Sequence, residues 1–350
     1  MTTRFADLTT LRVGGPVGTL VDAESEADLI DAIRSADASG TPLLVLGGGS
    51  NLLAADAAFE GVVVRDRRAR IDIASQDGCG GAAFTVTAGT PWEEVVEAAV
   101  THGWSGLEAL TGIPGSTGAT PVQNVGAYGQ EVAETIAAVR CWDRVEGRVR
   151  TFATGELGFG YRTSLLKRTI GDLGPTPRYV VLSVSFHTRL ATLSGPVRYA
   201  ELARTLGVEL GQRVAMAEAR QAVLGLRRAK GMVLEATDHD TWSAGSFFTN
   251  PIVAPDLVPA GAPTYPVDTH GGPERIKTSA AWLISGAGLG RGFTLGTPAA
   301  LSSKHVLALT NRGGASAADI LGLARHVREV VRRAYGITLV PEPVLVGLTL

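Results

Sequence analysis

The chain of 350 residues contains only two cysteines, Cys79 and Cys141. Two thiols are too few for a disulfide scaffold or a structural zinc site. The 32 basic and 34 acidic residues nearly cancel, which argues against binding of nucleic acid through bulk positive charge. No apolar run is long enough to span a bilayer, and the N-terminal segment lacks the apolar core of a signal peptide. We therefore expect no metal, no nucleic-acid or membrane partner, and a cytoplasmic location.

Glycine, in contrast, is abundant, with 44 residues. Because 45% of the chain is hydrophobic and only 19% is charged, it is expected to fold rather than to remain disordered. Its length favours two or three domains. The glycines must then lie in loops of a folded protein, where they let the backbone approach a ligand.

Caps and hydrophobic periodicity predict three helices. The first runs from a Ser25 cap to Gly40, and the third runs from Ser316 to Gly336. The second runs from a Thr90 cap to Gly103; Pro91 is its first helical residue, and Glu93 completes a capping box with Thr90. Short runs rich in β-branched residues predict strands at 42–46, 62–65, 83–87, 179–186, 306–310, 337–340 and 344–350. The order of these elements favours an α+β fold.

Two glycine-rich loops are the most informative segments. The first follows an apolar strand and consists of Gly47-Gly48-Gly49-Ser50-Asn51. Its N–H groups can point into one concavity and bind an anion; a plain tight turn is the alternative. The second loop, residues 111–129, has five glycines, two prolines and no formal charge, with a structural Ω-loop as the alternative. Neither has Walker or Rossmann spacing, so together they suggest a large nucleotide cofactor between subdomains.

Further motifs follow these loops in a fixed order. They are Tyr161-Arg162-Thr163-Ser164, the tyrosine segment 195–202, Arg227-Arg228-Ala229-Lys230, the Gly245–Pro251 segment and Pro341-Glu342. With the two loops they resemble the UDP-N-acetylenolpyruvoylglucosamine reductases, within the vanillyl-alcohol-oxidase-like FAD-binding superfamily. The tyrosine segment resembles that of the type I subclass. Thr163 departs from the family pattern, which often has Asp there.

The resemblance implies an FAD-binding module of two subdomains, residues 1–80 and 81–213, and a substrate-binding domain at 214–350, whose last strands can pack back on the FAD module. It implies a monomeric bacterial enzyme, UDP-N-acetylmuramate dehydrogenase, with non-covalent FAD and with NADPH as reductant. The substrate is UDP-N-acetylglucosamine enolpyruvate, and the product is UDP-N-acetylmuramate for peptidoglycan synthesis, which supports cell shape and division.

Three residues carry the chemistry that the resemblance implies. The flavin passes hydride to C3 of the enolpyruvyl group, and Ser246 donates a proton to C2. Arg162 grips the substrate carboxylate, and Glu342, in its neutral form, is the second polarising group. From residue type alone, a structural arginine, an exposed turn glutamate and a turn serine are the alternatives.

The resemblance also implies the binding residues. Those for FAD are Gly47, Gly48, Gly49, Ser50, Asn51, Thr111, Gly112, Pro114, Gly115, Ser116, Gly118, Ala119, Gln123, Asn124, Gly126, Ala127, Tyr128 and Gly129; those for the sugar nucleotide are Tyr161, Tyr199, Lys230, Asn250 and His305. Asp238-His239-Asp240 is predicted to be a polar loop rather than a metal site.

Two other functions stay open on the sequence. One is a different non-covalent FAD oxidoreductase of the same superfamily. The other is a sugar-nucleotide binding protein without catalytic activity, although the presence of Arg162, Ser246 and Glu342 argues against it.

Overall fold

The computed structural model describes residues 2–267 and 272–350, which divide into two compact units. The larger unit comprises Val17–Gly49 and Glu60–Val233. The smaller unit comprises Met1–Pro16, Ser50–Phe59 and Leu234–Leu350, so that three separate stretches of the chain build it. The predicted boundary at residue 80 lies in the turn of a β-hairpin inside the larger unit. The three-domain division therefore stays a prediction.

The larger unit combines two sheets with helices. Its helices are α2 (Glu26–Ser39), α3 (Trp92–His102), α4 (Thr120–Gln123), α5 (Leu165–Arg168), α6 (Ala200–Leu206) and α7 (Met216–Ala229), with 3-10 turns at 108–110, 117–119, 132–134 and 154–156. Its strands are β1 (Val17–Ala23), β2 (Leu43–Leu46), β4 (Phe59–Asp66), β5 (Ile71–Asp77), β6 (Gly81–Thr87), β7 (Trp104–Ser105), β8 (Gly126–Ala127), β9 (Gln130–Glu131), β10 (Ile136–Asp143), β11 (Arg148–Ala153) and β12 (Tyr179–Leu190).

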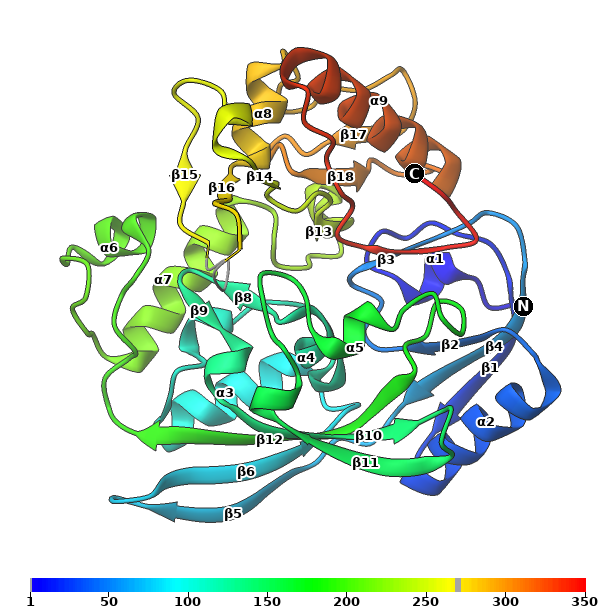
Figure 1. Ribbon diagram of the computed structural model, residues 1–350, viewed down its shortest axis with the longest axis vertical. Coiled ribbons are helices and arrows are strands. Elements are labelled where there is room, and N and C mark those ends of the chain that lie inside the picture. Colours follow the sequence, from blue (N-terminus) through cyan, green and yellow to red (C-terminus); the bar gives the residue numbers. More distant parts are fainter. Residues whose placement is uncertain (1, 268–271) are drawn as a thin grey trace. The chain divides into compact units, whose positions relative to one another are not determined.

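The two sheets differ in the relative direction of their neighbouring strands. Strands β1, β4 and β2 form a small sheet in which β2 and β4 are parallel. The other sheet has the order β11-β10-β12-β6-β5, with antiparallel neighbours (Figure 1). Strand β7 also pairs with β12. Helix α3 buries Trp92, Val95, Val96 and Ala99 in the same core as Phe84 and Phe186 of this sheet. The second glycine loop begins soon after this helix, at residue 111.

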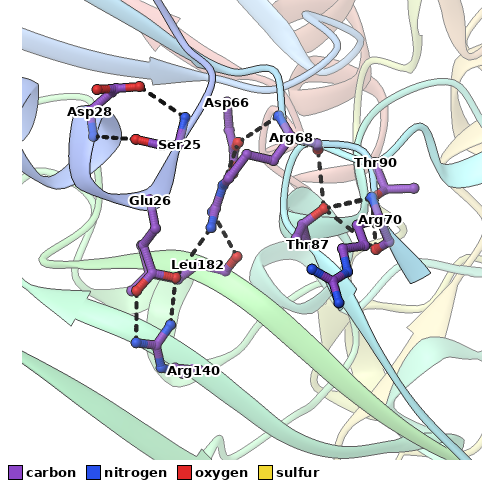
Figure 2. Close-up of polar contacts among 10 residues, drawn as sticks. All are labelled: Ser25, Glu26, Asp28, Asp66, Arg68, Arg70, Thr87, Thr90, Arg140 and Leu182. Atoms are coloured by element: carbon purple, nitrogen blue, oxygen red, sulfur yellow. Dashed lines mark hydrogen bonds and ion pairs between the residues drawn. The ribbon is translucent and has the colours of Figure 1, made fainter. Parts of the chain in front are cut away.

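An ion-pair cluster joins α2 to the larger sheet (Figure 2). Arg68 donates to both Asp66 oxygens, to Glu26 and to the Leu182 carbonyl of β12. Arg140 of β10 makes a bidentate pair with Glu26 at 2.6 and 2.7 Å. The side chains of Arg68 and Asp66 are only 12% and 8% exposed. Removal of either side chain would therefore leave a buried charge without its counter-ion.

The smaller unit packs around α9 (Ala317–Tyr335). Its other elements are α1 (Phe5–Leu8), α8 (Ala280–Gly286), β3 (Leu52–Ala54), β13 (Ser243–Ser246), β14 (Ile252–Val253), β15 (Thr264–Tyr265), β16 (Ile276–Thr278), β17 (Ala299–Leu301), β18 (Ala308–Asn311) and β19 (Val344–Val346), with 3-10 turns at 239–241 and 255–257. Helix α9 lies beside α8 and β17 (Figure 1). Its apolar face shares a core with α8, β17 and β18. Strand β19 pairs in parallel with β3, which returns the end of the chain to residues 52–54.

Most of the predicted elements are present, and the α+β class is confirmed. Ser25 and Ser316 cap α2 and α9 through reciprocal bonds with Asp28 and Asp319, and Gly40 and Gly336 end these helices in the left-handed conformation. None of the described helices combines the length and apolar character needed to cross a membrane.

Two local predictions are wrong. The run 337–340 is not a strand: Ile337 and Leu339 are buried in the core of the smaller unit, so their apolar character serves packing without a ladder. The Thr90 capping box is also absent, since the cap position of α3 is Pro91 and has no side-chain cap bond. Thr90 bonds instead with Thr87 and Arg70 (Figure 2), and Glu93 turns toward the second glycine loop.

Candidate active site

The structure brings the two glycine loops into direct contact inside the larger unit. A Cβ placed on Gly47 would lie 2.5 Å from the Ser116 Oγ, and one on Gly48 would lie 2.6 Å from the Gly115 Cα. Glycine is therefore required at both positions by the approach of the other loop. Gly49, which follows, has a left-handed φ of 62°. Neither loop has a charged residue of its own.

The second loop holds Arg162 through its carbonyl groups. The guanidinium donates to the Asn124 carbonyl at 3.3 Å and to the Gly126 carbonyl at 2.7 Å. Arg162, Asn124 and Tyr128 all have positive φ, between 45° and 54°, although none is glycine. Such conformations cost energy and persist only where neighbours enforce them, which is common at functional sites.

Three of the predicted binding residues gather around one another at the end of α7. The rings of Tyr128 and Tyr199 meet edge to face with centroids 5.4 Å apart, and the Lys230 Nζ lies 5.4 Å from the Tyr128 centroid. Lys230 also pairs with the Glu201 carboxylate. Burial raises the pKa of Tyr128 to about 12, so its hydroxyl stays protonated at neutral pH. The structure thus places Tyr128, which was predicted to bind FAD, beside two residues predicted to bind the sugar nucleotide.

In the smaller unit, the Gly245–Pro251 segment, called here the serine loop, lies beside the C-terminal segment that contains Glu342. The Glu342 N–H donates to the Phe247 carbonyl at 2.9 Å, and the Thr249 N–H donates to the Val340 carbonyl at 3.1 Å. Ser246 ends β13 after a register irregularity, next to Gly245 with its φ of 71°. Ser246 and Glu342 are separated by almost a hundred positions in the sequence, yet the fold makes their segments neighbours.

The remaining predicted residues lie in both units. Asn51 donates to the Glu342 carbonyl at 3.4 Å, so this end of the first glycine loop belongs with the Glu342 segment of the smaller unit. Asn250 accepts the Ala280 N–H at the start of α8, and His305 lies in the turn before β18. In the larger unit, Gln123 accepts from Lys167 at 2.6 Å.

The polar loop around Asp240 has a structural role. Asp240 is buried and accepts bonds from the Ser302 and Ser303 hydroxyls, the Ser303 N–H and Arg312. Burial raises the pKa of this carboxyl, but these donors outweigh it and lower the pKa below its usual value. Asp238 pairs with Lys304. These contacts attach the predicted polar loop, residues 238–240, to residues 302–304 before β18 and to Arg312 directly after it.

Three residues around the second glycine loop were not among the predicted site residues. Glu93 accepts the Gly112 N–H, Arg220 pairs with Glu93, and Arg227 donates to the Gly112 carbonyl. Arg227 was part of a recognised motif but received no role. Glu93 was assigned to helix capping, and no local pattern distinguishes that use from a bond to a loop 19 positions away.

The loops fit an FAD cofactor. Neutral backbone with a left-handed glycine can present N–H groups to a pyrophosphate, and the contact of Gly48 with Gly115 leaves no room for side chains. Residues 18–153 match the sequence profile of an FAD binding domain. The protein is therefore an FAD-binding protein in class, and the predicted FAD cofactor is confirmed.

The second match is more specific. Residues 237–346 match the profile described as the C-terminal domain of UDP-N-acetylenolpyruvoylglucosamine reductase. The reductase of that name from Cutibacterium acnes is 54% identical over 348 residues, covering 99% of this chain and 90% of its own length. The one from Thermobifida fusca is 48% identical, with full coverage of both chains. The crystal structure of the Thermus caldophilus enzyme aligns with a TM-score of 0.63 at 26% identity, over 99% of this chain and 98% of its own. The chain belongs to the UDP-N-acetylenolpyruvoylglucosamine reductase family.

Proposed function

We propose that this protein catalyses the NADPH-dependent, FAD-mediated reduction of UDP-N-acetylglucosamine enolpyruvate to UDP-N-acetylmuramate. The observation that carries the proposal is the backbone pairing of the serine loop with the glutamate segment, through Glu342 and Phe247. The names of the relatives, at about half identity over the whole chain, support the same reaction. The other FAD oxidoreductase and the non-catalytic binding protein have no comparable support.

Arg162 binds the substrate carboxylate in this proposal. Its guanidinium is oriented by the Asn124 and Gly126 carbonyls, which belong to the second glycine loop. A guanidinium has five N–H donors, so it can hold these carbonyls and a carboxylate together. Because negative charge spreads into that carboxylate during reduction, a cation fixed in advance stabilises the transition state more than the ground state.

Ser246 and Glu342 complete the reduction of the double bond. FAD held by the two glycine loops would, once reduced by NADPH, supply the hydride for C3 of the enolpyruvyl group. Ser246 donates the proton to C2, and solvent restores the serine proton, so each turnover consumes NADPH and one proton. Glu342, held next to the serine loop, polarises the developing enolate in its neutral form.

The cluster at the end of α7 binds the sugar nucleotide. We assign Lys230 to the diphosphate because its ammonium group attracts that charge, with Tyr199 in the same cluster. Tyr161, Asn250 and His305 are assigned to the same ligand from the motif resemblance, and both glycine loops are assigned to FAD. We place the enzyme in the bacterial cytoplasm, as a monomer that serves peptidoglycan precursor synthesis, without nucleic-acid or membrane partners. In this proposal the FAD module comprises subdomains 1–80 and 81–213, and residues 214–350 form the substrate-binding domain.

The Ser246→Ala variant tests the proposal by separating the two half-reactions. In anaerobic stopped-flow, NADPH should bleach the flavin of the variant and of the wild type at similar rates. Reoxidation by the enolpyruvyl sugar nucleotide should slow about 10²–10⁴-fold, the usual contribution of a general acid. Ser243→Ala is the matched control, since Ser243 is in the same strand and its hydroxyl accepts the Gly245 N–H. If reoxidation is equally fast in both variants, Ser246 is not the proton donor.

A further inference from the structure

Glu93 lies at the centre of a set of hydrogen bonds around the second glycine loop. Its Oε2 accepts the Gly112 N–H at 2.5 Å, and its Oε1 accepts the Thr111 hydroxyl at 2.8 Å. Arg220 of α7 donates to the same Oε1 at 2.7 Å. The carboxylate thus satisfies three donors from two separate parts of the chain. Bonds of this charge-assisted kind are about twice as strong as neutral ones.

The opposite side of Gly112 is held by a second arginine from the same helix. Arg227 donates to the Gly112 carbonyl at 3.2 Å and to the Met232 carbonyl at 2.8 Å. Burial lowers the pKa of Arg227 to about 10, so it remains charged at neutral pH. Gly112 has a φ of 68°, and a Cβ on it would lie 2.9 Å from the Leu224 Cδ2. Its N–H and carbonyl directions are therefore fixed from α3 and from α7.

Glu93 is not needed to stabilise helix α3 itself. Glu93 is near the start of α3, where any acidic side chain favours the helix dipole, and exposed Glu94 beside it already supplies that effect. The Glu93 and Arg220 side chains are 37% and 19% exposed, so their ion pair alone contributes little to stability. What the pair does specifically is hold Thr111 and Gly112, the first residues of the loop.

We propose that Glu93 and Arg220 are positioning residues for FAD, because they fix the entry of the second glycine loop in its binding conformation. The proposal rests on the proposed role of that loop in holding FAD. Helix α7 lies outside the segment 18–153 that matches an FAD binding domain, and it ends at Lys230. One helix thus sets the cofactor loop at Gly112 and carries the lysine assigned to the substrate diphosphate. A loop that is ordered before binding loses less entropy when the cofactor binds.

The test compares Glu93→Gln with Glu94→Gln in the full-length holoprotein. Both variants remove one negative charge from the first turn of α3, so their effects on the helix dipole are matched. The measurement is the rate of FAD release on dilution, followed by flavin fluorescence, together with the visible circular dichroism of the bound flavin. We expect Glu93→Gln to release FAD about 10- to 100-fold faster, the equivalent of one lost charge-assisted hydrogen bond. Glu94→Gln should stay within about twofold of the wild type, with an unchanged flavin spectrum.

Arg220→Met gives an independent test, which also serves if Glu93→Gln fails to fold. It removes the counter-ion of Glu93 but leaves the Gly112 bond, so a smaller acceleration is expected. The double variant should release FAD no faster than Glu93→Gln alone, because the two residues act as one unit. If Glu93→Gln releases FAD no faster than Glu94→Gln does, the inference is overturned. If Glu93→Gln does not fold, the same result in Arg220→Met overturns it. A wild-type protein that takes up no FAD overturns the proposed function itself.

Discussion

The contact between the two glycine loops can be tested by adding a single methyl group. Gly48→Ala would place a Cβ 2.6 Å from the Gly115 Cα and 3.2 Å from the Gly115 N and C atoms. All three are backbone atoms, which cannot rotate away as a flexible side chain would. Gly48 does not have the left-handed φ that Gly49 has, so the effect isolates the steric contact.

The size of the effect follows from ordinary contact distances. Carbon atoms pack at about 3.5–4.0 Å, so the loops must separate by about 1 Å. Insertion of a methyl group into well-packed structure typically costs about 1–3 kcal/mol. Because the displaced residues are those assigned to FAD, the free energy of unfolding and FAD affinity should both fall, affinity by at least about tenfold.

Urea unfolding of the FAD-free protein and fluorescence titration with FAD measure these two effects. The control is Gly225→Ala in α7, where the added Cβ meets nothing within 4 Å. This control should be stabilising by about 0.5–1 kcal/mol, since alanine is the better helix former. If Gly48→Ala matches the control in both measurements, the loops do not pack as described and the reasoning is refuted.

Other predictions concern the ion pairs. Arg68→Met leaves buried Asp66 without its cation, so the free energy of unfolding measured in urea should fall by about 3 kcal/mol. The control Arg70→Met removes a side chain that is 73% exposed and should lower it by less than about 0.5 kcal/mol. Equal losses would contradict the cluster in Figure 2. The Arg140 hydrogen bond holds the pKa of Glu26 below its usual value. Burial raises the pKa of Asp143, but the Arg178 bonds together with the Val145 and Glu146 N–H groups outweigh burial and lower that pKa. The contribution of these two carboxylates to the free energy of unfolding should therefore be complete above about pH 5 and be lost as the pH falls below about 4. The loss should be shallower in Arg140→Met. If the pH dependence of unfolding is unchanged in that variant, the Arg140–Glu26 ion pair is contradicted. Glu201→Gln frees Lys230 from a competing carboxylate, so KM for the sugar nucleotide should fall up to about fivefold while reduction by NADPH is unchanged; a higher KM would mean that Glu201 positions the lysine.

The sequence predicted best those parts of the fold with local signals. The helices that begin at Ser25 and Ser316 have reciprocal caps within four residues and a glycine at the end, so each signal lies inside its own element. Helix α7 was missed because it begins after Ala215 without a side-chain cap. Strand β5 was missed because most of its residues are exposed and lack an alternating apolar face.

Prediction of the candidate site was likewise limited to residues in local motifs. Motif resemblance indicated Arg162, Ser246 and Glu342, but only the structure shows that Glu342 pairs with the backbone beside Ser246. The contacts of Gly48 with Gly115 and of Glu93 with Gly112 depend on how distant segments meet. No spacing in the sequence encodes them, because the chain path between them is set by the sheet and by α3.

The central claim is that this protein reduces the enolpyruvyl ether of a UDP-sugar through bound FAD. Its most direct test is anaerobic titration of the purified full-length protein. The protein should be yellow, acid should release FAD, and one equivalent of NADPH should bleach it. Addition of UDP-N-acetylglucosamine enolpyruvate should then restore the oxidised flavin spectrum with formation of one equivalent of UDP-N-acetylmuramate. A bleached protein that this substrate does not reoxidise would contradict the claim.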